Sequence, residues 1–230
     1  MSFFEKLTDG LKLYEVLMLG FGGLMFLVLL VLLVLLAVRQ KPLRPLLLYF
    51  VIAVLVLGWP SVQKIKIDDT GVEINKATEQ YAEKPTEENK KKVADLIGAL
   101  KERDVKNPDV VKKIAMAEFA IGKTQESLQT IETLPVKERQ DNSVKQLRAS
   151  IQLSDSLQTQ LRVVQNNAPD SSQIKKLNEL HSRAVNLPIK SPQLDSNIHT
   201  ANQEITEYKR RNPGVKMITT TTHVVAPNHQ

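Results

Sequence analysis

The amino-acid sequence predicts an all-α protein in which an N-terminal two-helix transmembrane hairpin precedes a soluble helical domain. Much of the 42% apolar content falls in the first sixty residues, in two runs without a charged residue. From about residue 84, apolar residues instead recur at spacings of three and four, which is typical of amphipathic helices. We therefore expect a membrane hairpin over residues 1–63, a short β-hairpin and linker over 64–83, a helical domain over 84–211 and a disordered tail over 212–230.

The two apolar runs are predicted to cross a bilayer as separate helices, at about residues 16–38 and 46–62. The first run exceeds the roughly 20 residues that a membrane span needs. Prolines in the basic turn between the runs prevent one continuous helix. A cleaved signal peptide is the alternative, but its apolar core is only about 7 to 15 residues long and follows a basic segment that this chain lacks. Trp59, before Pro60, is expected to be an anchor at the membrane interface.

The basic residues near these runs predict how the hairpin is oriented, because Lys and Arg resist translocation. Arg39, Lys41 and Arg44 are concentrated in the short turn, whereas the lysines on the opposite side are spread over longer flanks and diluted by acids. We therefore expect the turn to lie in the cytoplasm. The chain would then be an integral protein of the cytoplasmic (inner) membrane of a bacterial envelope, with its C-terminal domain extracytoplasmic.

The segment after the membrane runs predicts a short β-hairpin. Ile65 and Ile67 alternate with polar residues, Asp68–Gly71 has the composition of a turn, and Val72 and Ile74 resume the alternation. The aspartates also suggest a calcium loop, but the full ladder of acidic ligands is missing. The sequence therefore favours a turn at this point and no metal site.

The remaining chain is predicted to form amphipathic helices with recognisable ends. Thr86 is a helix cap, Pro108 follows the capping residue Asn107, and Ser191 caps the last helix. Gly122 is expected to end the helix that begins at Pro108, and Thr124 to cap the next. The expected helices cover about residues 86–103, 108–121, 124–134, 142–165, 172–187 and 192–211.

One pair of these helices resembles a tetratricopeptide-type repeat. Its large, small and turn positions are matched by Val111, Ile114, Ala115, Phe119, Gly122, Ser127, Leu128 and Ile131. The resemblance implies a TPR-like helix pair with Phe119 buried between its helices, and stacking on neighbouring helices to complete the core. Glu118 stands where such a repeat has an aromatic residue, and no second copy follows at a fixed period. The expected packing residues of this pair are Ile114, Ala115, Phe119, Gly122, Leu128 and Ile131.

The composition disfavours several classes of function. The chain has no cysteine and only four histidines, and its motifs include no phosphate loop, nucleophile elbow or metal-ligand spacing. We therefore expect no enzyme activity, cofactor or metal. The net charge of +6 is dispersed and lacks interleaved aromatics, so nucleic acid is not an expected partner.

Three functional classes remain open at this point. The favoured one is a membrane-anchored interaction or scaffold protein that presents a helical domain to an unknown protein partner, with self-association possible. The alternative is a small membrane effector or pore-type protein whose hairpin oligomerises under control of the helical domain. An envelope enzyme with an unrecognised site is the third.

Overall fold

The computed structural model describes residues 7–39, 44–166 and 169–213. The chain divides into two compact units, Met1–Ala117 and Glu118–Gln230, and the division falls inside helix α5, Pro108–Ala120. The described residues form helices and no strand. The predicted all-helical character is therefore confirmed in this part of the chain.

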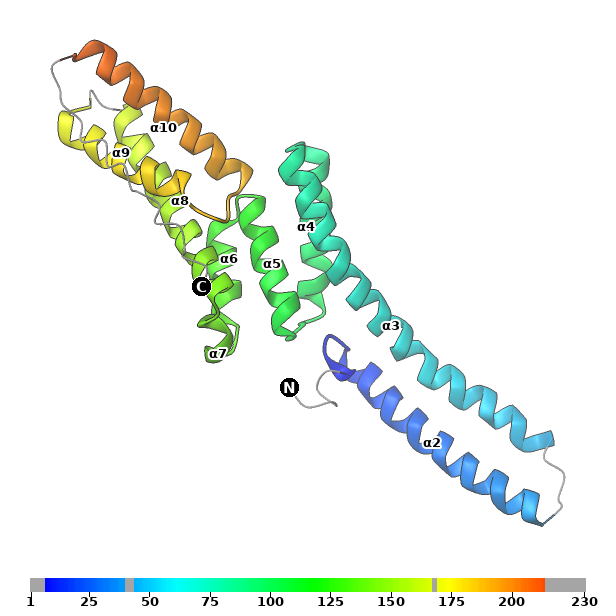
Figure 1. The fold of residues 1–230 in the computed structure, drawn as a ribbon. Coiled ribbons are helices and arrows are strands. Elements are labelled where there is room, and N and C mark those ends of the chain that lie inside the picture. Colours follow the sequence, from blue (N-terminus) through cyan, green and yellow to red (C-terminus); the bar gives the residue numbers. More distant parts are fainter. Residues whose placement is uncertain (1–6, 40–43, 167–168, 214–230) are drawn as a thin grey trace, which may run out of the picture. The chain divides into compact units, whose positions relative to one another are not determined.

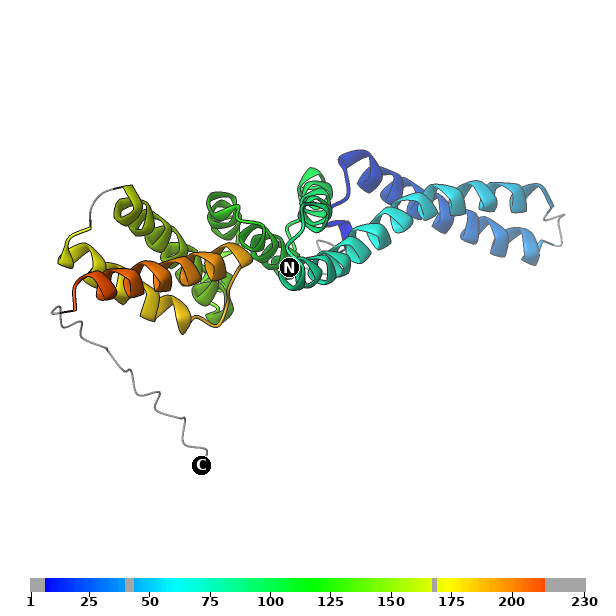
Figure 2. The same cartoon turned by 90° about the horizontal axis from the view of Figure 1, so that it is seen from above.

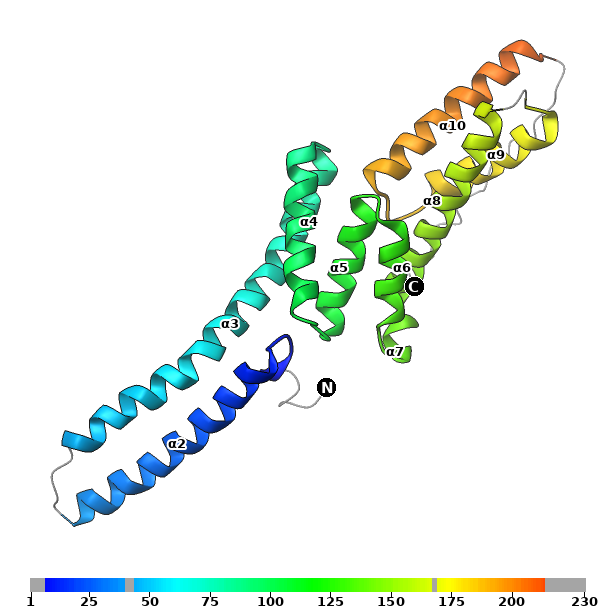
Figure 3. The same cartoon turned by 180° about the vertical axis from the view of Figure 1, so that it is seen from behind.

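The first unit begins with a hairpin of two long helices, α2 (Leu13–Val38) and α3 (Arg44–Glu83). They lie side by side in all three views (Figures 1, 2 and 3). The rings of Phe26 and Phe50 meet edge to face with centroids 5.5 Å apart. A Cβ on Gly22 would lie only 3.0 Å from Leu57 Cγ, so glycine permits the close approach of the helices. Both helices are long and apolar enough to span a membrane.

The predicted β-hairpin at 64–83 is wrong, because α3 continues through Pro60 to Glu83 as one helix of 40 residues. The alternation of isoleucine and valine is coincidental, since Ile65 and Val72 are exposed whereas Ile67 and Ile74 are buried. The buried positions recur at three and four residues, as in a helix. Those buried positions are Ile67, Gly71, Ile74, Ala77 and Tyr81.

The expected turn at Asp68–Gly71 forms helical interactions instead. Lys64 pairs with Asp68 one turn away, with 3.2 Å between Nζ and Oδ1. The hydroxyl of Thr70 donates to the carbonyl of Lys66 over 2.7 Å, which satisfies its polar group within the helix. Tertiary burial of one face of α3 therefore overrides the local turn signal of the sequence.

One further helix packs against the C-terminal part of α3, and a second makes individual contacts with it. Helix α4 (Glu87–Glu102) is capped by Thr86, whose hydroxyl accepts from the backbone N–H of Asn89, and it packs on α3 (Figures 1 and 3). The start of α5 also contacts α3, because Lys113 Nζ donates to the carbonyl of Gly71 over 3.1 Å. Thr86 therefore caps α4 as the sequence predicts.

The described part of the second unit contains the end of α5 and five further helices. The predicted cap at Thr124 is displaced by one residue, because Thr124 is already helical and Lys123 precedes it. The short helix α7 was not expected. Ser191 Oγ accepts from the N–H of Leu194 over 3.2 Å, as the sequence predicts. The helices are α6 (Thr124–Glu132), α7 (Val136–Arg139), α8 (Asn142–Asn166), α9 (Ser171–Val185) and α10 (Pro192–Arg211).

Helices α8, α9 and α10 pack together into a three-helix layer, seen in yellow-green to orange in Figure 1. Each pair of the three is in contact, and each helix turns one apolar stripe inward. Helix α6 and α7 contact α8 as well. The fully buried side chains of the three-helix layer include Ile151, Leu157, Ile174, Leu177, Ala184, Leu194 and Ala201.

A change of Gly71 to alanine distinguishes a helix from a turn at this position. A Cβ there would lie 3.6 Å from Val110 Cγ2, an ordinary van der Waals contact. Because glycine weakens a helix interior, Gly71→Ala should raise the free energy of unfolding by about 0.5 to 1 kcal/mol. Chemical denaturation of the full chain in detergent, followed by circular dichroism, measures this.

Gly10→Ala is the matched control in the same unit. Gly10 has a φ of +75°, and a Cβ there would meet Ile67 and Val105 at 3.1 Å, so this variant should lose about 1 kcal/mol or more. Loss of stability in Gly71→Ala comparable to that in Gly10→Ala would contradict the continuous helix.

Candidate functional site

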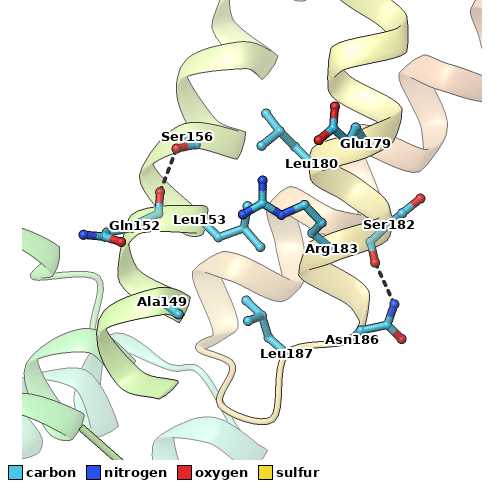
Figure 4. A pocket seen from close by; sticks show the side chains of 10 residues that line it. All are labelled: Ala149, Gln152, Leu153, Ser156, Glu179, Leu180, Ser182, Arg183, Asn186 and Leu187. Carbon is cyan, nitrogen blue, oxygen red and sulfur yellow. Dashed lines mark hydrogen bonds between the residues drawn. The ribbon is translucent and has the colours of Figure 1, made fainter. Parts of the chain in front are cut away.

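A groove lies between α8 and α9 in the second unit. Its volume is about 680 Å³, and Figure 4 shows Leu153 of α8 and Leu180 and Arg183 of α9 directed into the space between the two helices. A space of this size lies in the range of about 300 to 1,000 Å³ that is usual for ligand pockets. The residues that line it are Ala149, Gln152, Leu153, Ser156, Glu179, Leu180, Ser182, Arg183, Asn186 and Leu187.

Helix α9 is held in place from its first turn. Asp170 caps it, because a carboxylate oxygen accepts from the N–H of Gln173 over 2.8 Å while the Gln173 side chain accepts from the N–H of Asp170. The hydrogen bonds from Gln173 and Ser172 hold the pKa of Asp170 below its ordinary value. Ile174 and Leu177 are fully buried on the apolar stripe that Leu180 continues. This anchoring fixes which α9 residues face the groove.

The floor of the groove is apolar. Leu153 from α8 and Leu180 from α9 are 7% and 8% exposed, and Leu187 beyond the end of α9 is half-buried. On the α8 side, the exposed lining residues Ala149, Gln152 and Ser156 carry no charge. The α8 wall therefore presents a small, neutral surface to any occupant.

The polar groups along the groove differ in whether they already have partners. Ser156 Oγ donates to the Gln152 carbonyl over 2.8 Å, and Asn186 Nδ2 donates to the Ser182 carbonyl over 2.9 Å (Figure 4). Arg183 extends toward α8 beside Leu153, and among the described residues it has no ion-pair partner. Arg183 is therefore a cation available to a bound acidic group at the edge of an apolar surface.

This arrangement can contact a polypeptide segment that carries both apolar and acidic side chains. Leucine side chains offer apolar area, and a free guanidinium can bind a carboxylate through two parallel hydrogen bonds. Within the described residues, no group of three His, Asp or Glu side chains is placed to hold a metal ion.

A second polar arrangement, the hairpin-base cluster, lies in the first unit and consists of Asp9, Glu15, Gln63, Lys64 and Arg103. Arg103 Nη1 donates to both carboxylate oxygens of Glu15 at 3.0 Å, and its Nη2 donates to Gln63 Oε1 at 3.0 Å. Lys64 Nζ donates to the carbonyl of Asp9 at 3.2 Å. The polar groups of this cluster hydrogen-bond to one another, so we assign the cluster a structural role.

The residues predicted to pack the TPR-like pair are largely buried. Ile114, Ala115, Phe119 and Ile131 are at most 3% exposed, while Leu128 is half-buried. Gly122 follows α5 with a φ of +85°, the left-handed conformation that favours glycine after a helix.

Glu118 is buried one residue before Phe119. It accepts a hydrogen bond from Thr130 Oγ1 over 2.6 Å, which joins the end of α5 to α6. A buried carboxylate therefore joins α5 to α6 at the position where the predicted TPR-like pair would have an aromatic ring.

The predicted topology residues lie at the turn of the hairpin. Arg39 directly follows α2 and is exposed, and Arg44 is the first residue of α3. Lys41 lies outside the described residues. Trp59 lies within α3 and is 54% exposed.

Most groove residues escaped prediction, because they lie off the main apolar stripes. Leu180 belongs to the stripe of its helix, but Leu153 falls between the stripe positions Ile151 and Leu157 of α8. A leucine outside the stripe indicates that a helix has a second apolar face. Such a signal marks a surface without showing which helix faces it.

Comparison with known proteins gives no further guide to this site. A scan against protein-family models, a search of curated proteins and a search of solved structures each found no significant match.

Truncation of Phe119 tests the core around the end of α5. Phe119 is 1% exposed, so Phe119→Ala should cost about 3 to 5 kcal/mol in the free energy of unfolding, through lost apolar burial and the cavity left behind. Leu128→Ala is the control and should cost less, because Leu128 is half-buried. Equal losses in urea denaturation would contradict the central packing role of Phe119.

The acid sensitivity of the second unit should depend on His181. Burial lowers the pKa of His181, so the unfolded chain takes up the proton first as the pH falls below about 6.5. Stability contributed by neutral His181 is present above that pH and is lost on acidification. Thermal unfolding between about pH 7 and pH 5 should therefore shift less in His181→Gln than in the parent.

His199→Gln provides the control for this titration, because His199 is exposed on α10. It should leave the shift unchanged. Identical pH dependence in the parent and His181→Gln would show that protonation of His181 is not coupled to unfolding.

Proposed function

We propose that the chain is a membrane-anchored interaction or scaffold protein, which holds a helical binding domain at a bilayer surface and binds a polypeptide partner without catalysis. The observation that carries this proposal is the α8–α9 groove, where an apolar floor lies beside an unpaired Arg183. The length and apolar character of α2 and α3 support insertion into a membrane. The basic turn favours an extracytoplasmic helical domain, with partners in the envelope.

The groove favours a partner segment that combines aliphatic and acidic side chains. Leu153 and Leu180 would contact its aliphatic side, and Arg183 would bind its carboxylate. An amphipathic helix supplies such residues at spacings of three and four along one side, which is a common mode of recognition in a helical groove. The proposed TPR-like pair would complete the helical surface that presents this groove.

Site-specific photocrosslinking in the membranes of the producing cells tests this function. A benzophenone amino acid replaces Gln152, which lines the groove and is exposed, or Arg162, an exposed residue elsewhere on α8. We expect a discrete polypeptide adduct from position 152 and none from position 162. Mass spectrometry of the adduct then identifies the segment that is bound.

Arg183→Glu in the 152 background tests the role of charge. Loss of one charge-assisted contact of about 1.5 to 3 kcal/mol should reduce the adduct at least tenfold. Arg162→Glu, with the same change of charge outside the groove, should leave it unchanged. Equal adducts in both variants, or the same adduct from both probe positions, would refute binding in the groove.

A further inference from the structure

The wall that α9 contributes to the groove carries two opposite charges, Glu179 and Arg183. Both side chains are exposed and line the groove, and Figure 4 shows both on the side of α9 that faces α8. They are four residues apart, so they lie on one face of the helix with a rise of about 6 Å between them. The groove therefore presents an ordered pair of charges, with the negative one nearer the start of α9.

Neither charge has a counter-charge within the described part of the chain. Among these residues, Glu179 and Arg183 form no ion pair with each other or with another side chain. Lys176, one turn before Glu179, is exposed but does not line the groove and is likewise unpaired in this part of the chain. The opposite wall cannot supply either charge, because the exposed lining residues of α8 are neutral. An occupant of the groove is therefore the source that can compensate both.

An occupant that covers the apolar floor also removes water from beside these charges. Glu179 directly precedes Leu180, which forms part of that floor. A carboxylate that loses water without gaining a partner destabilises a complex. A segment that carries only acids would in addition bring a like charge close to Glu179. Recognition by Arg183 alone is therefore incomplete, and Glu179 disfavours a purely acidic partner.

The α8 wall leaves room for the backbone of an occupant. Ala149 and Ser156 are seven residues apart, so they lie two turns apart on one face of α8, and both have short side chains. Ser156 Oγ already donates to the carbonyl of Gln152 over 2.8 Å, so it needs no partner from outside. A helix can therefore lie close to α8 while its charged side chains reach α9.

We infer that the segment bound in the groove is a helix with one acidic and one basic side chain three or four residues apart on the same side. Arg183 binds the acid and Glu179 binds the base. This inference rests on the proposed function and narrows its partner, because an acid alone no longer suffices. The two charges also fix the position of the helix along the groove, since a shift by one turn would place its acid beside Glu179.

Four synthetic helical peptides test this inference. All carry the same symmetric set of leucines on one side, and on its flank two variable positions four residues apart hold Glu and Lys, Glu and Gln, Gln and Lys, or Gln twice. Because the leucines are symmetric, a peptide can enter in either direction and one order of the charges suffices. Binding of each labelled peptide is measured by fluorescence anisotropy with the full-length chain in phosphatidylcholine nanodiscs, as the parent, Glu179→Gln and Arg183→Gln.

We expect each peptide charge to matter only when its partner on α9 is present. Replacing the peptide Lys by Gln should weaken binding to the parent about two- to fivefold, and should leave binding to Glu179→Gln unchanged. Replacing the peptide Glu should weaken binding to the parent about tenfold, with no effect in Arg183→Gln. Differences in the helicity of the free peptides cancel in this comparison. Glu126→Gln, which changes an exposed acid on α6 outside the groove, should behave as the parent.

The outcomes separate this inference from the proposed function. A peptide Lys that contributes nothing, or contributes equally in Glu179→Gln, refutes the acid–base partner and leaves recognition of an acid by Arg183 in place. Binding that is equal in the parent and Arg183→Gln, or absent for all four peptides, refutes the groove site on which both proposals rest. Glu179 and Arg183 are exposed, so neither change disturbs the core of the second unit.

Discussion

A desolvated carboxylate, Glu15, sets the arrangement of the first unit. Its side chain is 1% exposed at the start of an apolar helix, where an uncompensated charge would be costly. Arg103, the residue that follows α4, neutralises it with two hydrogen bonds from Nη1 and donates from Nη2 to Gln63 of α3. One guanidinium thus ties α2, α3 and α4 together. Asp9 acts similarly on α5, because its carboxylate accepts from the N–H groups of Lys106 and Asn107 before that helix begins.

Interactions within a few residues could be predicted from the sequence, and those across long separations could not. Thr86 and Ser191 act as caps because their hydroxyls need only the backbone three residues ahead. Glu15 and Arg103 are 88 residues apart, and nothing local to either residue indicates the other. The groove could not be predicted for the same reason, since Leu153 and Arg183 belong to different helices. The apolar runs of the hairpin could be predicted from the sequence because their signal is length and composition alone.

The wrong prediction of a β-hairpin after residue 64 shows that one short segment can fit both the two-residue period of a strand and the period of a helix. Ile65, Ile67, Val72 and Ile74 fit an alternation of two, and Asp68–Gly71 fits a turn. Helical contacts of one face of α3 with α4 and with Val110 decide between the periods, and they are tertiary. The residues left over by the inward face, Ile65 and Val72, are exposed. The wrong prediction therefore has its origin in a helix with apolar residues on two opposite faces.

Pro60 makes α3 easier to bend at this position. Proline has no N–H, so the carbonyl of Val56, four residues earlier, loses its helical partner, and the helix resists bending less at this level. In a membrane, the apolar segment before Pro60 would have to adjust its tilt to the thickness of the bilayer, while the segment after it is held by Gln63 and Lys64. Bending at Pro60 would let the apolar segment before residue 60 change its tilt in response to hydrophobic mismatch. The same protein could thereby reside in bilayers of different thickness without straining the helices packed above.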